Sequence, residues 1–429
     1  MFFKKIIKII QKTEFSLFLI TIILFRIPPF FLMPLTKNPL LTSHSLGRYF
    51  VVWLFFSNIL FIFIGYKRLL FSKNLGLLTL FFFVTQSFSI VKAINTEAFL
   101  LQYKNFVFGF VIFITALLII NSKRKLLLVL NTLLLTIFFN VVFQTIIYFQ
   151  PEFLIKIVQR FLYESYWDVL NLNLKRERFF VDIYDAALLP LIIALSLKTQ
   201  RRSARLIYVL LMISVAFFAF VSNFRTQLIM TIFSLLSSLI LLLNKNRVIF
   251  TVLFLFVFYI GIIISIKIVG YNTLSRVLLQ EAEDIQTITG RFEHWQRSLD
   301  MVNSSPYVGV GLGNYYDNLN SKTTFTTSIF NWKNTLGRIT ATHPHSVFFG
   351  TVSETGYLGL FSYILLLLYF LITDYKNILK KNKSAIPSII SFWSLSIYAA
   401  FNPPVTLPYF FIFWLLRVFI IKTSIINCK

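Results

Sequence analysis

The sequence predicts an all-α protein, a polytopic membrane bundle of about twelve transmembrane helices, and three observations lead to this prediction. Hydrophobic residues make up 57% of the 429 residues and charged residues only 13%, which is too little charge to cover a water-soluble protein of this length. The hydrophobic residues also gather in runs long enough to cross a bilayer, which takes roughly 17–25 residues. The basic residues between these runs are unevenly distributed, as they are in membrane proteins with a fixed orientation.

The runs follow one another along the whole chain. They cover residues 15–34, 49–65, 75–94, 106–121, 126–149, 183–197, 206–222, 227–243, 248–269, 346–372, 385–401 and 405–421. Because basic residues precede the first run, it resembles a signal peptide, but Arg26 and the Ile27–Phe30 segment offer no small-residue cleavage site. We therefore expect a retained first span, and spans that are nearly free of charged residues.

The net charge of +25 is explained by membrane topology. If the N-terminus is cytoplasmic, roughly half of the 41 lysines and arginines fall on cytoplasmic segments, together with only Glu14 and Asp374 of the 16 acidic residues. Both termini are then cytoplasmic, and a nucleic-acid partner is not expected. The single cysteine, Cys428, excludes a disulfide framework and a thiolate metal site.

We expect one integral membrane domain over residues 1–429, with a large, partly helical loop at 270–345 on the outer side, before the tenth span. Loops of this length in a compact bundle usually carry function. An amphipathic helix is predicted from Arg291 to Val302, opened by Thr289-Gly290 and stopped by Asn303–Pro306.

Two arginines are candidates for chemistry, because an ionisable side chain at membrane depth costs roughly 2.5–3.5 kcal/mol and needs a reason to be there. Arg225 lies in a very short turn between two spans, at the outer face. It is either an arginine that snorkels to the surface at a helix end or a fixed cation that points into a cavity. Arg291, at the start of the loop helix, is by itself consistent with an ordinary solvated residue.

Where the loop re-enters the membrane, the chain reads His343-Pro344-His345, and Glu354 follows. A metal site is not expected, because no compact set of further ligands accompanies the histidines. A histidine at the water–lipid boundary suits proton transfer near neutral pH. The glycines of Gly309–Gly313 predict a tight turn, since they do not follow a strand and their spacing does not fit a nucleotide-binding loop.

Taken in order, these motifs resemble those of the O-antigen ligase and polymerase superfamily of integral-membrane glycosyltransferases. The motifs lie within residues 175–360. They are Arg225, Gly290-Arg291 with Trp295, Pro306-x-x-Gly309-x-Gly311, His345 with Glu354 nine residues later, and Gly356-x-x-Gly359. Two departures are Ser346, where many relatives have asparagine, and the Arg178–Asp185 segment, to which we assign no role.

The resemblance implies a GT-C-like fold in the bacterial inner membrane and a metal-independent, cofactor-free glycosyltransferase of surface-polysaccharide synthesis, such as that of lipopolysaccharide. Its donor would be an oligosaccharide on undecaprenyl diphosphate, and its acceptor another glycan. Arg225 and Arg291 match the arginines that take the charge of the leaving diphosphate. His345 matches the histidine that acts on the acceptor hydroxyl, as general base or by orienting it.

Further residues are expected to contact the substrates. They are Glu354, His343, Arg338 and Trp295. Glu354 either orients His345 or caps a polar contact. A chain-length regulator is a further candidate partner, besides membrane lipid.

Alternatives remain open at this point. Within the superfamily, the balanced charge of loop 270–345 favours a polymerase, whose acceptor is another lipid-linked repeat unit, over a ligase, whose acceptor is the strongly anionic lipid A–core. Outside it, a polysaccharide flippase or other transporter is the alternative. Transporters often have internal repeats and ionisable residues along a midplane path, whereas the charges here gather at the outer boundary.

Overall fold

The computed structural model describes residues 2–27, 43–63, 72–150, 183–221, 224–242, 282–322, 344–402 and 407–426. Every element in these residues is a helix, which confirms the predicted fold class. The elements are α1 (Phe2–Arg26), α3 (Ser43–Phe63), α4 (Lys73–Phe88), η2 (Ser89–Lys92), α5 (Thr96–Ile119), α6 (Lys123–Phe149), η3 (Ile183–Leu188), α9 (Leu189–Lys198), α10 (Arg202–Val221), α11 (Arg225–Leu242), α14 (Ala282–Ser304), α15 (Tyr315–Lys322), α16 (Val347–Leu379), α17 (Ile386–Phe401) and α18 (Leu407–Ile426).

Each predicted span overlaps a helix, except 248–269, which lies outside the described residues. Among the described helices, six are long and apolar enough to cross a membrane. These are α4 with η2, α5, α6, α10, α11 and α16. The polytopic membrane architecture follows from them.

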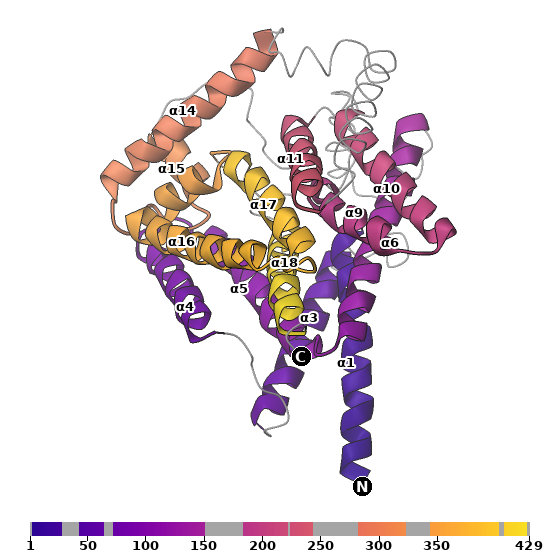
Figure 1. Cartoon of the computed structure of the whole chain (residues 1–429). Helices are drawn as coiled ribbons and strands as arrows, with labels where there is room; N and C mark the ends of the chain where they lie inside the picture. The colour runs from indigo at the N-terminus through magenta and orange to yellow at the C-terminus, as the bar shows by residue number, and fades with distance from the viewer. Residues whose placement is uncertain are drawn as a thin grey trace.

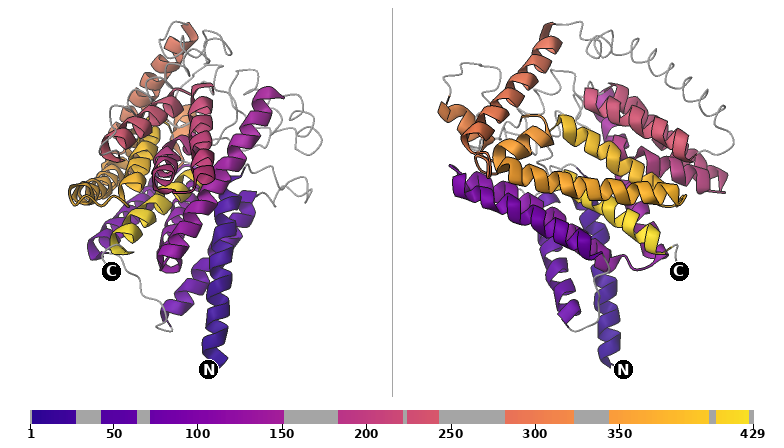
Figure 2. Two further views of the ribbon diagram at one scale, coloured as in Figure 1. Left: turned by 45° about the vertical axis from the view of Figure 1, so that its right-hand side comes forward. Right: turned by 60° about the vertical axis from the view of Figure 1, so that its left-hand side comes forward.

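The bundle packs around close contacts between helices that are distant in sequence (Figures 1 and 2). Helix α18 lies along α5, where Gly109 allows the approach: a Cβ there would be 2.7 Å from the Cβ of Phe410. Trp414 of α18 packs with Phe113 of α5, with ring centroids 4.8 Å apart. Helix α16 lies along α4, and α11 lies along α17.

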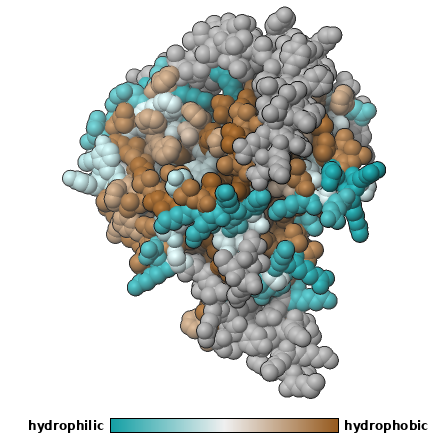
Figure 3. All heavy atoms as spheres, viewed as in Figure 1, coloured by the Kyte–Doolittle hydropathy of each residue, from teal (hydrophilic) through white to brown (hydrophobic). Residues whose placement is uncertain are grey.

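Much of the outer surface is apolar, as expected where lipid is the solvent. Figure 3 shows hydrophobic residues over a large part of one face, with a band of hydrophilic residues across it. Phe56 is 64% exposed and Leu80 61% exposed, although both lie in the middle of apolar helices.

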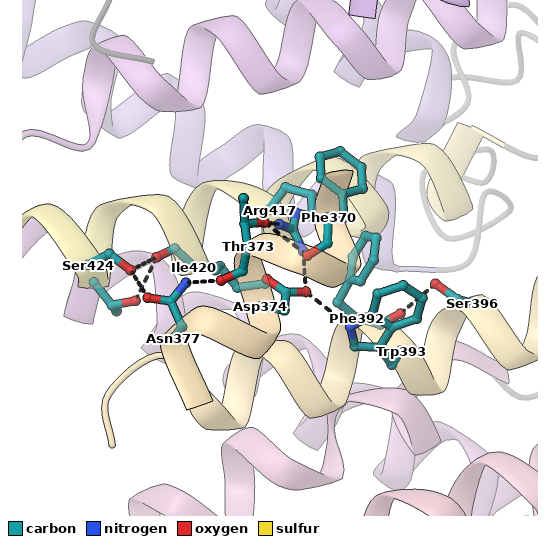
Figure 4. A network of polar contacts seen from close by, with 11 residues as sticks. Phe370, Thr373, Asp374, Asn377, Phe392, Trp393, Ser396, Arg417, Ile420 and Ser424 are labelled. Carbon is teal, nitrogen blue, oxygen red and sulfur yellow. Dashed lines mark hydrogen bonds and ion pairs between the residues drawn. The ribbon is translucent and has the colours of Figure 1, made fainter. Parts of the chain in front are cut away.

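Two buried ion pairs join charged residues that lie in or next to the predicted spans. Helix α16 runs on to Leu379, so Asp374 lies inside it rather than in a cytoplasmic loop, and its side chain is buried. Its Oδ2 accepts a hydrogen bond from Arg417 of α18 at 2.7 Å, and the guanidinium lies 4.0 Å from the ring centroid of Phe370 (Figure 4). Arg26 of α1 pairs likewise with Asp185 of η3. A hydropathy pattern does not show such pairs, because the partners are far apart in sequence.

Candidate functional site

The predicted glycine turn fills a break in helix α16. Gly356 interrupts that helix with φ 67° and ψ −170°, a conformation that suits glycine. The turn after α14 supplies hydrogen bonds there: the N–H of Val310 donates to the carbonyl of Ser353 at 2.9 Å, and the N–H of Tyr357 donates to the carbonyl of Pro306 at 2.7 Å. The tight turn is thus confirmed, and its partner is the start of α16.

Glu354 joins the same turn from inside α16. Its side chain is 2% exposed, and its carboxylate accepts hydrogen bonds from the backbone N–H groups of Gly313 and Tyr315. Its own carbonyl accepts from the N–H of Gly311 at 2.9 Å. We expected Glu354 either to orient His345 or to cap a polar contact. The contacts described here are of the second kind.

His345 stands directly before α16 in an unusual conformation. Its φ of 51° lies in the left-handed region, which is uncommon for any residue except glycine. Its Nδ1 is buried and has no hydrogen-bond partner in the part of the chain that the structure describes. Backbone strain and an unsatisfied buried nitrogen each cost roughly 1–3 kcal/mol, and both are typical of functional sites.

Charge and burial around His345 keep its ring neutral. Burial is the largest cause that lowers the pKa of His345 to about 4, and the positive charge of Arg291 and the ring of His294 lower it further. The rings of His294 and His345 lie 6.4 Å apart. At neutral pH, His345 is therefore an uncharged imidazole that can accept a proton.

The two candidate arginines belong to different helices, and an electrostatic interaction links them. Arg225 is the first residue of α11, whose first turn is held by a 2.8 Å hydrogen bond from Asn402 Nδ2 to Thr226 Oγ1. Arg291 is half-buried in α14, and its pKa is lowered first by burial and then by the charge of Arg225. The positive charges of the two guanidinium groups thus act on each other.

Helix α14 carries Arg291 and begins at Ala282 in the structure, earlier than the predicted start at Thr289-Gly290. Gly290 lies inside the helix, where a glycine costs only about 1 kcal/mol relative to alanine and is tolerated. The predicted end is confirmed, since the helix stops at Ser304.

Trp295 fixes α14 against the start of α16. Its Nε1 donates a hydrogen bond to the carbonyl of Pro344 at 2.8 Å, and its ring stacks on Phe349 with centroids 4.9 Å apart. These contacts position the backbone that carries His345, and the expected sugar contact of Trp295 stays a prediction. His343 and Arg338 lie outside the described residues.

The sequence interpretation did not predict a contact between His294 and Tyr315. The hydroxyl of Tyr315 lies 3.0 Å from His294 Nδ1 and donates to the carbonyl of His294 at 3.0 Å. Tyr315 is fully buried, and burial raises its pKa, whereas burial lowers the pKa of His294. Only the position of His294, one helical turn after Arg291, was a sequence signal for this pair.

Among the described residues, no group of three or more histidine, cysteine, aspartate or glutamate side chains could hold a metal ion. The candidate residues that influence one another electrostatically are two cations and an imidazole. Such a set can bind an anion and accept a proton.

Comparison with known families bears on this same segment. Residues 207–364 match a family model described as O-antigen ligase. No curated protein matches the chain. The matched residues run from α10 into α16 and include Arg225, Arg291, His345 and Glu354.

Proposed function

We propose, on the premise of this resemblance to the O-antigen ligase and polymerase superfamily, that the chain is a membrane glycosyltransferase. It would transfer a glycan from a polyprenyl diphosphate to a hydroxyl of an acceptor sugar. We place the reaction on the outer side of a bacterial inner membrane, with both termini in the cytoplasm and the loop 270–345 over the site. The chain would act as a single membrane domain, without a metal ion.

One observation carries the proposal: Arg225 and Arg291 hold like charges close together beside a neutral histidine. A diphosphate offers two phosphoryl groups for two guanidinium groups, and arginine binds phosphate through paired hydrogen bonds. The negative charge on the leaving diphosphate grows as the glycosidic bond breaks. Preorganised cations therefore stabilise the transition state more than the ground state.

His345 would act on the acceptor sugar, as the base that accepts its hydroxyl proton. The acceptor hydroxyl oxygen would attack the anomeric carbon, the bond from that carbon to the diphosphate oxygen would break, and the diphosphate would leave with the electron pair. The hydroxyl proton would pass to the neutral imidazole. A bound diphosphate also offsets the charge of Arg291, which raises the pKa of His345 and makes it a stronger base once the donor is in place.

Within this class we favour the polymerase, in which the acceptor is a second lipid-linked repeat unit. The balanced charge of loop 270–345 supports it, since a ligase must receive the strongly anionic lipid A–core. A chain-length regulator would then be a partner. The family match is consistent with either enzyme and lends no support to the flippase alternative.

Loss of the gene in its own bacterium tests the proposal on one lipopolysaccharide gel. A polymerase loss leaves core capped by a single repeat unit. A ligase loss leaves bare core while lipid-linked polymer accumulates, which would retain the transferase and overturn the polymerase assignment. Repeat units that stay inside the cell would instead indicate a flippase and overturn the proposal.

A further inference from the structure

A cavity of about 130 Å³ lies between α6, α9, α17 and α18. Helix α16 begins beside His345 and leads away from α14 and α15 toward the side of the C-terminus (Figure 2, right). It ends at Leu379, shortly before Ser384, which lines the cavity. The cavity therefore lies at the other end of the bundle from the candidate active site.

Most of the lining residues are apolar, and two lysines at helix ends, which we call the rim, add positive charge. Leu130, Leu191 and Phe419 are among the apolar residues. Lys123, the first residue of α6, and Lys198, the last residue of α9, line it too. None of the residues that line the cavity is acidic.

Three sources of positive potential meet at this rim. Lys123 and Lys198 are close enough for their like charges to interact. Helix α17 starts here, and its N-cap residue Ala385 makes no side-chain capping bond, so the positive end of the helix dipole adds to the two ammonium groups. The hydroxyl groups of Ser384 and Ser388 lie on the same lining. An anion at the rim would offset this repulsion.

The apolar side chains of the lining favour an anion that also carries a hydrocarbon chain. A small inorganic anion would use only the rim, whereas an amphiphile uses both parts. A cavity of about 150 Å³ holds a benzene molecule, so this one accommodates a short stretch of an acyl chain. Leu127, also on the lining, is 43% exposed, so the rest of the chain can continue along the outer face of α6.

We propose that this cavity binds one anionic phospholipid, with its phosphate between Lys123 and Lys198 and part of one acyl chain inside. The site is independent of the transferase proposal, because it shares no residue with the Arg225–Arg291–His345 cluster. It would act as a fixed lipid site at the membrane face opposite to the chemistry.

Native mass spectrometry of the purified full chain, titrated with phosphatidylglycerol or phosphatidylcholine in detergent, tests the proposal. The double variant Lys123→Ala/Lys198→Ala is expected to bind phosphatidylglycerol about thirtyfold more weakly, since each lysine near a lipid phosphate contributes ~1 kcal/mol. The matched control Lys376→Ala/Lys380→Ala removes two exposed lysines, one from the last turn of α16 and one from its C-cap, outside the cavity, and should keep the wild-type affinity within about twofold.

Two comparisons separate the lipid from other occupants. In wild type, phosphatidylcholine should bind at least about tenfold more weakly than phosphatidylglycerol, and inorganic phosphate should compete poorly because it cannot use the apolar walls. Ala194→Leu, which narrows the cavity and leaves both lysines, should weaken phosphatidylglycerol binding. Equal binding of both lipids or full competition by phosphate would overturn the proposal. So would wild-type phosphatidylglycerol binding by Lys123→Ala/Lys198→Ala or by Ala194→Leu.

Discussion

Gly309 lies against the backbone of Glu354 so closely that a Cβ on the glycine would come within 2.4 Å of the glutamate carbonyl carbon. The φ of Gly309 is +68°, which also disfavours any side chain. The turn after α14 therefore packs directly against the backbone of α16 at Glu354, next to the break in that helix. This contact holds the turn that follows α14, the helix of Arg291, against α16, the helix that follows His345.

Replacement of Gly309 by alanine should therefore destabilise the protein by about 3 kcal/mol or more, because backbone atoms of α16 cannot yield. Thermal unfolding of the purified protein in detergent measures this. The matched control is Gly290→Ala in α14, where a Cβ meets nothing within 4 Å. It should be neutral or stabilising by up to about 1 kcal/mol. Equal effects of the two substitutions would contradict the close packing.

Glu354→Gln should reduce stability and glycan transfer together, because it puts a neutral amide, with one acceptor oxygen and an added NH2 donor, where a carboxylate accepts from the N–H groups of Gly313 and Tyr315. A positioning role predicts that the pH profile of the remaining transfer keeps its wild-type shape. Initial rates between pH 4 and 8, with the melting temperature of the same sample, check this. A shifted profile at unchanged stability would instead give Glu354 a direct part in proton transfer.

The low pKa of His345 predicts where transfer fails in acid. The imidazole must be unprotonated to accept the hydroxyl proton, so kcat/KM should fall only as the pH drops toward about 4. Bound diphosphate offsets the charge of Arg291, so the acid limb of kcat should lie at higher pH than that of kcat/KM. Rates at low and saturating donor measure both limbs. If the acid limb of kcat lay at the same pH as that of kcat/KM, or at a lower pH, bound diphosphate would not raise the pKa of His345.

The buried Arg417–Asp374 pair predicts strong non-additivity. Asp374→Leu alone leaves a guanidinium unpaired among apolar side chains and should cost about 3–5 kcal/mol, whereas Asp374→Leu/Arg417→Met should recover most of that loss. A double-mutant cycle on apparent melting temperatures measures the coupling. Additive losses would mean that the pair is not coupled in the folded protein.

The sequence was sufficient for the fold class, because apolar runs and basic loops report on each span separately. It did not reveal contacts between distant segments. Arg26 and Asp185 are 159 positions apart, and nothing local to either residue identifies the other. Asp374 was predicted to lie in a loop because the hydropathy of the chain falls before α16 ends at Leu379. Its partner Arg417 is distant in sequence, so no local pattern indicated a buried carboxylate.

The same holds for the candidate site, where the sequence indicated the residues but not the contacts between distant segments. The order of Arg225, Arg291 and His345 along the chain indicated a family, and the structure adds that the charges of Arg225 and Arg291, and of Arg291 and His345, act on each other. The glycine spacing indicated a turn but not its docking into the break at Gly356. The Tyr315–His294 contact depends on how α14 and α15 pack, which a linear pattern does not contain.

The central claim is that Arg291 stabilises a leaving diphosphate beside His345, and the rate of glycan transfer by Arg291→Ala tests it most directly. The purified full chain in lipid nanodiscs should lose about a hundredfold to a thousandfold in kcat while its melting temperature stays unchanged. Arg225→Ala and His345→Ala should behave alike. Lys92→Ala, which removes an exposed cation from the end of η2, should keep the wild-type rate within about twofold. A wild-type rate in folded Arg291→Ala protein would contradict the account.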